Sequence, residues 1–418
     1  IIFSMKITDN ILYLADIPVE TIMQEYGSPL YVYEESVLRS QFRELFAGFP
    51  EGLLEIHYSM KANSNPSLLR ILAEEGSSID AVSEFEVRLA LECGFEAQQI
   101  IFTGNNNSLQ EIEYCVEQNV AVNLGSLVLL EKYGQRYPET TVSVRVNPGI
   151  GAGHHSHCIT GGPDSKFGIY HDQIEAALAL AKKYKLTLNG VHSHIGTGIY
   201  SAEPMLVAME MILDVAEKFP DLQFVDFGGG FGIPYKPEQL ALDMDDLSQK
   251  MSARFAKFIQ HYGRELRMKI EPGRLLIGPA GVLLATVTNI TDTPKHSFVG
   301  VDSGFNHLVR PTMYGSYHKI LNASRISDVE KNVVVVGNIC ESGDILSRSG
   351  DEIIRKMTSP LVGERLAFLD AGAYGISMSS QYNMRPRPAE VLVHQGQSRL
   401  IRRAETFEDL TQCFVDFN

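Results

Sequence analysis

The sequence predicts an α/β fold, a (β/α)8 TIM-like barrel joined to a C-terminal, mostly β domain that also takes the N-terminal strand. Between residues 50 and 274, short β-type runs alternate repeatedly with helical stretches, which favours a barrel over an open sheet. After residue 274 the chain reads as strands separated by turns. We therefore expect a barrel over residues 37–285 and a β-rich domain from residues 1–36 and 286–418, with an open doubly wound sheet as the structural alternative.

Each element is predicted from its local pattern. Barrel strands are expected at the apolar runs 55–60, 79–82, 100–103, 120–124, 141–146, 188–194, 223–227 and 267–271. Helices are expected between them, where apolar residues recur at spacings of three and four; examples are 84–93, 108–117, 173–183 and 204–218. The β-rich part should use residues 29–33, 275–292, 297–302, 333–340, 365–370, 389–394 and 398–403.

The composition excludes several classes of function. The chain has 418 residues, 44% hydrophobic content and a formal net charge of −15, which argues against binding along nucleic acid or on an anionic membrane. No apolar run approaches the ~20 residues that a membrane span needs. The opening residues 1–6 lack the long apolar core of a signal peptide, and Met5 is a candidate natural start.

The cysteines indicate a reducing compartment. Five are present, and no CxxC pair occurs among them, so neither a disulfide framework nor a structural zinc site is predicted. They are Cys93, Cys115, Cys158, Cys340 and Cys413. We therefore expect a cytoplasmic protein.

Lys61 is the most informative residue. The apolar run before it delivers one amine to the carboxyl end of the first predicted barrel strand, where the turn-prone segment 62–65 begins. Desolvation at such a place lowers the pKa of a lysine and makes its amine a nucleophile toward carbonyl compounds. The alternative is an ordinary lysine whose ammonium extends to solvent.

Other polar residues follow the remaining barrel strands, and in a barrel the carboxyl ends of the strands carry the chemistry. The residues at these ends are Asp80, Ser83, Gly104, Asn105, Arg145, Asn147, His192, His194, Gly228–Gly230 and Glu271–Arg274. This coincidence predicts a single site at one rim of the barrel.

Within this group, the cluster Gly228–Gly232 and Arg274 predict a phosphate site, because glycines let backbone N–H groups converge and a guanidinium binds phosphate oxygens. A tight turn is the alternative for the glycines. Glu271 could keep a pyridine-type nitrogen protonated, or form a structural ion pair with Arg274. His194 could stack on an aromatic ring; a metal site built on His192 and His194 has no third ligand in view.

Three segments of the β-rich part carry further candidates. Cys340 and Glu341 leave a β run and could donate a proton. Arg310 and Tyr314 are four residues apart and could hold a carboxylate. Tyr374 offers a hydroxyl on a glycine-flanked loop. Plain packing is the alternative for the cysteine and for the tyrosine on the loop.

These motifs together resemble the fold-type III pyridoxal-phosphate decarboxylases, the alanine racemase-like barrel group, and within it the diaminopimelate decarboxylases. The resemblance runs almost end to end, from residues 29–33 to residues 385–391. Its most specific pieces are Lys61–Asn63, His194–Gly196, Gly228–Gly230, Glu271–Arg274, Cys340–Ser342 and Gly372–Gly375.

The resemblance implies a cofactor, pyridoxal 5'-phosphate, and a role for each matching residue. Lys61 would hold the cofactor covalently, His194 would stack on its ring, Glu271 would pair with the ring nitrogen, and Gly230 and Arg274 would hold the phosphate. The implied cofactor-binding set is Lys61, Asp80, His194, Thr197, Gly229, Gly230, Glu271, Gly273, Arg274 and Tyr374, and no metal is implied.

The resemblance also implies how the substrate binds. Its carboxylate would bind Arg274, Arg310 and Tyr314. Glu341 would bind its distal ammonium, and Tyr374 would contact both substrate and cofactor. Cys340 would be the proton donor. In this family Cys340 and Glu341 reach into the partner subunit's site, so a homodimer with shared active sites is expected.

The implied reaction is decarboxylation of meso-2,6-diaminopimelate at its D-configured centre, which yields L-lysine and CO2. The alternatives are an ornithine, arginine or carboxynorspermidine decarboxylase, an amino-acid racemase and a non-catalytic regulatory relative. Thr197 replaces the usual serine of the family but keeps its hydroxyl. Gly125 precedes Ser126 where the family frequently has an acidic residue. The segment 151–168 resembles a loop over the site.

Overall fold

The computed structural model describes residues 5–153 and 160–415. It divides the chain into two compact units, each described by itself below. One is the barrel unit, formed by residues 41–233 and 240–275. The other is the β-rich unit, formed by residues up to 40, residues 234–239 and residues from 276 onward.

The barrel unit is built on eight parallel strands that close on themselves. In space the order is β5, β6, β7, β8, β9, β11, β12 and β13, and β13 pairs back with β5. The strands are β5 Leu54–Ser59, β6 Ser78–Ala81, β7 Ile100–Phe102, β8 Ala121–Leu124, β9 Thr141–Asn147, β11 Thr187–His192, β12 Phe224–Asp226 and β13 Arg267–Ile270. The short β10 Ile169–Tyr170 pairs with β9 outside the closed path. The predicted barrel is confirmed, and the open sheet is wrong.

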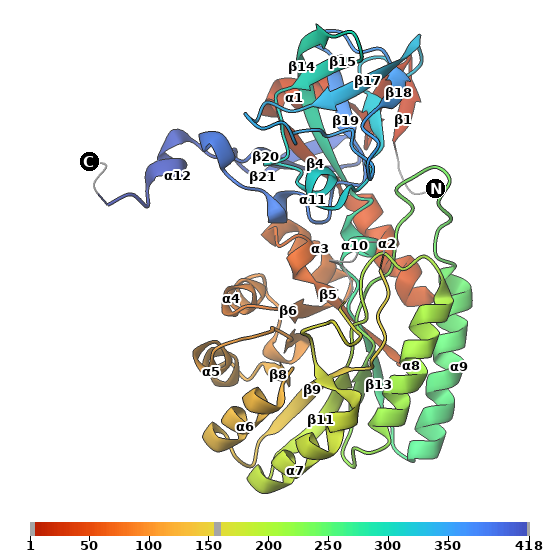
Figure 1. Ribbon diagram of the computed structural model, residues 1–418, viewed down its shortest axis with the longest axis vertical. Coiled ribbons are helices and arrows are strands. Elements are labelled where there is room, and N and C mark those ends of the chain that lie inside the picture. The colour runs from red at the N-terminus through yellow and green to blue at the C-terminus, as the bar shows by residue number, and fades with distance from the viewer. Residues whose placement is uncertain (1–4, 154–159, 416–418) are drawn as a thin grey trace. The chain divides into compact units, whose positions relative to one another are not determined.

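Helices follow most of the strands and lie around the outside of the barrel, as Figure 1 shows for α4 to α7. Several begin at a side chain that caps their first turn: the carbonyl oxygen of Asn65 or the hydroxyl of Ser83, Ser108 or Ser126 accepts a backbone N–H. The helices are α2 Glu35–Ala47, α3 Pro66–Glu74, α4 Glu84–Glu92, α5 Leu109–Glu117, α6 Leu127–Arg136, α7 Ile174–Tyr184, α8 Ala202–Ala216 and α9 Met244–Tyr262.

The β-rich unit contains a larger sheet in the order β18, β17, β15, β14, β4, β20 and β21, and a small sheet of β1 to β3. In the larger sheet β19 also pairs with β14, and β16 pairs with β19. Strand β4 runs antiparallel to β14 and parallel to β20, so the N-terminal strand does enter this domain. The strands are β1 Lys6–Thr8, β2 Ile11–Leu14, β3 Ile17–Pro18, β4 Leu30–Glu34, β14 Gly281–Asp292, β15 Ser297–Val301, β16 Ile320–Asn322, β17 Glu330–Val336, β18 Arg355–Thr358, β19 Arg365–Phe368, β20 Ala389–His394 and β21 Gln397–Arg402.

The core of this unit forms because alternate residues of its strands point to one face. Leu30 and Val32 of β4 pack there with Val282 and Leu284 of β14 and with Val391 of β20. The helices of this unit are short: α1 Val19–Tyr26, α11 Arg310–Tyr314 and α12 Phe407–Thr411, while α10 Arg274–Ile277 lies where the two units join along the chain.

Several predicted strand ends differ from the structure. The run expected from residue 275 begins as helix α10, so its strand starts at Gly281. Strand β11 ends at His192 rather than at residue 194. Strand β17 ends at Val336, because the Asp344 carboxylate accepts the backbone N–H of Ile339 at 2.8 Å and turns the chain away. Within the described residues, no helix is long and apolar enough to cross a membrane.

Candidate active site at the rim of the barrel

Lys61 lies in a 3₁₀ turn, Met60–Ala62, directly after β5, so it follows the first barrel strand as the sequence predicts. Its Nζ lies 2.8 Å from Oδ2 of Asp80, which is fully buried on β6. The hydroxyl of Ser59 donates to the same oxygen at 2.7 Å, and the hydroxyl of Thr103 donates to Oδ1. Asp80 therefore fixes the direction of the amine.

The electrostatics of Asp80 agree with this arrangement. Burial by itself would raise the pKa of this carboxyl, but the charge of Lys61 and the hydrogen bonds from Lys61, Thr103 and Ser59 outweigh burial, so the pKa is lowered below its ordinary value. The side chain of Lys61 keeps 37% of its surface exposed. The amine is thus paired and oriented while it stays accessible to a carbonyl group.

His194 follows β11 with its ring in a fixed orientation. Its Nδ1 accepts the backbone N–H of Gly229 at 3.0 Å. Burial, followed by the positive charges of Arg145 and Lys61, lowers the pKa of this imidazole well below its ordinary value. The imidazole is therefore neutral. Its planar ring, held in one orientation, suits stacking on an aromatic cofactor.

The glycine cluster after β12 is required by close backbone contacts. Gly228 and Gly230 have φ of +68° and +99°. A Cβ on Gly229 would lie 2.1 Å from the carbonyl oxygen of Glu271, so the loop could not pass β13 with a side chain there. The tight-turn alternative and the phosphate prediction are thus both compatible with this loop.

The prediction that the cluster's N–H groups converge on a phosphate needs a correction. The N–H of Gly228 donates to Oδ1 of Asp226 at 2.9 Å, and that of Gly229 donates to His194. The N–H of Gly232 donates to the carbonyl oxygen of Ile199 at 2.9 Å. Three of the five N–H groups of the cluster are therefore used inside the described part of the barrel.

Glu271 follows β13 and is buried with 4% exposure. Its Oε2 lies 3.2 Å from Nε2 of His192, and its Oε1 is buried without a hydrogen-bond partner among the described residues. Because leaving a buried carboxylate oxygen unsatisfied is costly, this atom points to a missing donor such as a protonated ring nitrogen. The ion-pair partner that the structure gives Glu271 is His192.

Other predicted residues line the same unit. Gly273 packs against the end of β5, where a Cβ would lie 3.0 Å from that of Ala62. Arg274 is buried at the start of α10, and Thr197 lies half-buried between β11 and α8. Arg145 on β9 is buried, and burial lowers its pKa although nearby Glu271 and Asp80 act against this shift.

The β-rich unit holds the predicted substrate residues other than Arg274. Arg310 begins α11 and is buried with 1% exposure; its guanidinium donates to Nε2 of His318 at 2.8 Å and lies 4.6 Å from the ring centre of Tyr235. Tyr314 ends the same helix. The guanidinium is thus held rigidly, as carboxylate binding requires.

Tyr374 lies on the predicted glycine-flanked loop, with φ of +57°. Cys340 and Glu341 are exposed in the loop between β17 and β18, whereas the sequence placed Cys340 at a strand end. The amide oxygen of Asn383 accepts the N–H of Cys340 at 2.7 Å, and the Glu341 carboxylate accepts the N–H of Gly343 at 2.8 Å. The loop therefore presents both side chains outward.

The predicted loop 151–168 is tied down at its base. The side chain of Asn147, at the end of β9, accepts the N–H groups of Gly149 and Gly162 at 3.0 and 2.9 Å. The segment containing His154, His155 and His157 lies outside the described residues.

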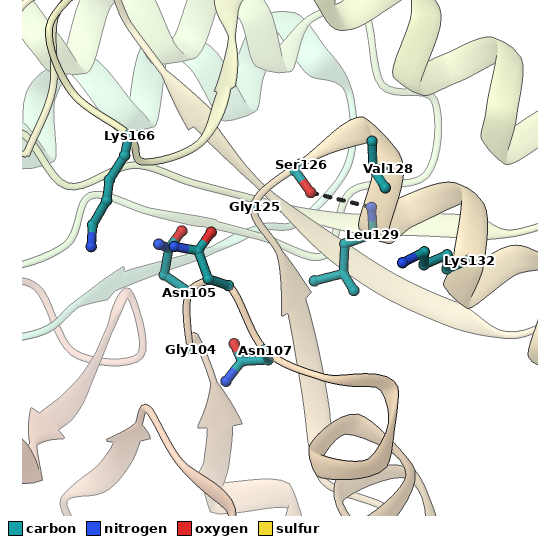
Figure 2. A pocket seen from close by; sticks show the side chains of 10 residues that line it. Gly104, Asn105, Asn107, Gly125, Ser126, Val128, Leu129, Lys132 and Lys166 are labelled. Atoms are coloured by element: carbon teal, nitrogen blue, oxygen red, sulfur yellow. Dashed lines mark hydrogen bonds between the residues drawn. The ribbon is translucent and has the colours of Figure 1, made fainter.

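A separate pocket opens after β7 and β8, with a volume of about 300 Å³ (Figure 2). Figure 2 shows Lys166 and Lys132 on opposite sides of it, with Asn105 between them. Its other lining residues are Gly104, Asn106, Asn107, Gly125, Ser126, Val128 and Leu129. It lies at the same end of the strands as Lys61, with two cations and no acidic group in its lining.

The barrel unit thus fits a pyridoxal-type cofactor. It offers an oriented amine, a buried carboxylate oxygen that no described residue contacts by a hydrogen bond, a neutral imidazole and a glycine cradle. A closed parallel barrel with this site defines a barrel-type pyridoxal-dependent enzyme. Residues 36–278 match the family described as "Pyridoxal-dependent decarboxylase, pyridoxal binding domain".

The comparisons narrow this class. The chain is 43% identical to the diaminopimelate decarboxylase of Methanothermobacter thermautotrophicus, over 93% of this chain and 92% of the other. A crystal structure of a diaminopimelate decarboxylase superposes with a TM-score of 0.90 at 34% identity, covering 98% and 99% of the two chains. That of Helicobacter pylori, complexed with L-lysine, gives 0.86 at 31% identity, covering 94% and 98%. The chain belongs to the diaminopimelate decarboxylases and is a pyridoxal-phosphate-dependent decarboxylase.

Four residues at the site were missed or left without a role by sequence reasoning. Ser59 and Thr103 hold Asp80, while Asp226 and Asn123 lie beside Glu271 and His192. For Asp226 a signal existed, because an aspartate two residues before a glycine commonly accepts that glycine's N–H. The contacts of Ser59, Thr103 and Asn123 depend on which strands are neighbours in the barrel.

Proposed function

We propose that this protein decarboxylates meso-2,6-diaminopimelate at its D-configured centre, giving L-lysine and CO2 in the last step of lysine biosynthesis. The observation that carries the proposal is the pair of Lys61 and Asp80 at the rim of the barrel, 2.8 Å apart, in a chain of the diaminopimelate decarboxylase family. This pair supplies the accessible amine that the chemistry needs.

In this proposal Lys61 holds pyridoxal phosphate and Asp80 orients its amine. Glu271 accepts a hydrogen bond from the protonated ring nitrogen through Oε1, which the described residues leave unpartnered. His194 would lie against the ring, and Thr197, Gly230, Gly273 and Arg274 would hold the phosphate. When bound, a cofactor with a protonated ring accepts the electron pair that the departing CO2 leaves behind.

We assign substrate recognition to five residues. Arg274, Arg310 and Tyr314 bind a substrate carboxylate, Glu341 binds the distal ammonium, and Tyr374 contacts substrate and cofactor. The rigid hold on Arg310 by His318 supports its role, because an immobilised guanidinium loses little entropy on binding.

Cys340 delivers the proton that replaces the lost carboxylate. We place it and Glu341 in the site of a partner subunit, so that the enzyme works as a homodimer with shared active sites. The outward presentation of both side chains supports this arrangement. We also propose that the enzyme acts in the cytoplasm.

The test is CO2 release from the holoenzyme with five amino acids: meso-diaminopimelate, L,L-diaminopimelate, L-lysine, L-ornithine and L-arginine. We expect release from the meso isomer alone, with an equal amount of L-lysine formed. Release from ornithine or arginine would show that the enzyme acts on a different class of substrate. No release from any of the five, with cofactor bound, would contradict the proposed reaction.

A further inference from the structure

Arg310, to which the proposed function gives a substrate carboxylate, is contacted by a buried histidine whose role is still open. Nη1 of Arg310 lies 2.8 Å from Nε2 of His318, and Nδ1 of His318 lies 2.8 Å from the carbonyl oxygen of Leu369. Arg310 and His318 are at most 1% exposed, and all three residues belong to the β-rich unit. The imidazole therefore links the guanidinium to the backbone of a neighbouring segment.

The fold brings these three residues together through one turn and one strand pair. Helix α11 is followed by Gly315, whose φ of +60° reverses the chain and lets its N–H donate to the carbonyl oxygen of Arg310. Strand β16 then pairs antiparallel with β19, and next to this pair the N–H of Leu369 donates to the carbonyl oxygen of Lys319 at 2.9 Å. His318 lies in the chain between the turn and the strand pair, so its ring can contact both Arg310 and Leu369.

Both contacts of the imidazole have a fixed direction. The guanidinium of Arg310 has only N–H donors, so Nε2 of His318 must accept. The carbonyl oxygen of Leu369 only accepts, so Nδ1 must carry the proton and donate. A doubly protonated ring would set an N–H of His318 against an N–H of Arg310. The imidazole is therefore neutral, with its proton on Nδ1.

A tyrosine ring restricts the guanidinium from another side. The guanidinium of Arg310 lies over the ring of Tyr235, 4.6 Å from the ring centre, and the rings of Tyr235 and His318 meet edge to face with 5.4 Å between their centres. The aromatic ring limits the tilt of the guanidinium, and the acceptor nitrogen of His318 fixes how the guanidinium is turned. Because the imidazole is neutral, it holds Arg310 without cancelling the positive charge, whereas a carboxylate in its place would compete with that of a substrate.

The proposed reaction decides which substrate carboxylate this guanidinium binds. Meso-diaminopimelate carries two carboxylates; one departs as CO2, and the other remains in L-lysine. A buried guanidinium beside the departing carboxylate would stabilise a negative charge that this group loses in the transition state, and would slow the reaction. Arg310 is therefore suited to the carboxylate that remains in the product.

We propose that His318 is a positioning residue that holds the guanidinium of Arg310 in the direction required by the carboxylate that remains in the product. It acts through Arg310 and sets the selectivity of the site for amino acids that keep a second carboxylate. The proposal rests on the substrate-binding role given above to Arg310. Loss of the acceptor at Nε2 should therefore weaken the binding of ligands that carry this carboxylate and of no others.

The first test compares two inhibitors of CO2 release from meso-diaminopimelate by the holoenzyme: L-lysine, and 1,5-diaminopentane, which lacks the carboxylate. His318→Asn keeps an amide near the place of Nδ1 but has no acceptor at the place of Nε2. It should weaken inhibition by L-lysine about tenfold and raise KM for meso-diaminopimelate by a similar factor, with kcat and inhibition by 1,5-diaminopentane within about threefold of the native values. His318→Gln, whose amide oxygen can accept from Arg310, should stay within about threefold of the native enzyme in every measurement.

The matched control is His307→Asn. His307 is also buried in the β-rich unit, with 2% exposure, and its Nε2 donates to the carbonyl oxygen of Pro386 at 3.1 Å. Urea unfolding should show a loss of stability in this variant, while both inhibitors act on it as on the native enzyme. The control thus separates a loss of stability from a loss of carboxylate binding.

The second test reads the tautomer in the native holoenzyme and does not depend on how well His318→Asn folds. Histidine labelled with ¹⁵N, with the His318 signal assigned by its loss in His318→Gln, distinguishes a protonated Nδ1 from a protonated Nε2. We expect the proton on Nδ1 alone. A proton on Nε2, alone or together with one on Nδ1, would overturn the proposal.

The outcomes distinguish failure of the proposed function from failure of the positioning role. If the native holoenzyme releases no CO2 from meso-diaminopimelate, the proposed function fails. If it is active and L-lysine inhibits His318→Asn as strongly as the native enzyme, only the positioning role fails. An equal loss in His318→Asn and His318→Gln, or an equal loss toward both inhibitors, would show that the imidazole only fills space, and would also overturn the proposal.

Discussion

Replacing Gly230 by alanine tests whether the glycine cradle is built by close backbone packing. Gly230 has φ of +99°, and a Cβ there would lie 2.3 Å from the carbonyl oxygen of Gly196. The loop cannot easily move away, because the carbonyl oxygen of Gly230 accepts the N–H groups of Gly198 and Ile199, both at 3.0 Å. The change therefore adds both a strained backbone and a steric clash.

The matched control is Gly94→Ala in the same unit. Gly94 has nearly the same φ, +97°, but a Cβ there meets nothing within 4 Å. Backbone strain alone should cost each variant roughly 1–2 kcal/mol. The clash should cost Gly230→Ala about 1–3 kcal/mol more, the usual range for overpacking.

Urea unfolding of the apoproteins gives the difference in free energy of unfolding between the two variants, from which the shared strain cancels. Affinity for pyridoxal phosphate is the second readout and should fall in Gly230→Ala alone. Equal losses of stability in both variants, with equal cofactor affinity, would refute the packing argument for the cradle.

Further predictions concern single residues of the site. Lys61→Ala should abolish both turnover and the visible absorption of bound pyridoxal phosphate; retained turnover would reject its role. Cys340→Ala should slow turnover and leave the cofactor bound, whereas loss of the cofactor would make its role structural. Asp80 has a lowered pKa, so it stabilises the fold above its ordinary value of 3.8 and this contribution disappears as the pH falls through the folded value. The stability deficit of Asp80→Asn, measured by urea unfolding, should therefore shrink in acid, and a constant deficit would contradict this. Asp226 has a raised pKa, so its ionisation above 3.8 opposes folding, and Asp226→Asn should gain stability relative to the native protein as the pH rises toward neutrality. No change in that difference with pH would reject the assignment.

The barrel could be predicted because its strands are locally apolar and its helices carry a regular spacing. The rim residues followed, because in a parallel barrel every residue after a strand lies at the same end. Lys61, Asp80 and Glu271 come together for this reason. The three-residue strand β12 could also be predicted, because two of its residues, Phe224 and Val225, are apolar, and both are buried in the structure.

What could not be predicted depends on strand register and on loops. Asn123 lies opposite Ser143, and His192 lies opposite Arg145, only because β8, β9 and β11 pair in that register. A single sequence does not contain this alignment. Likewise the early end of β17 depends on Asp344. Its carboxylate accepts the N–H groups of Ile339 and Phe305, which lie far apart in the chain.

The central claim is that Lys61 is the residue that holds pyridoxal phosphate. Borohydride reduction of the holoenzyme, followed by proteolysis and mass spectrometry, locates the lysine to which the cofactor is fixed. The account predicts one modified site, on the peptide that contains Lys61, and none in Lys61→Ala. Modification of Lys132, Lys166 or another lysine in the native enzyme, with Lys61 unmodified, would contradict it.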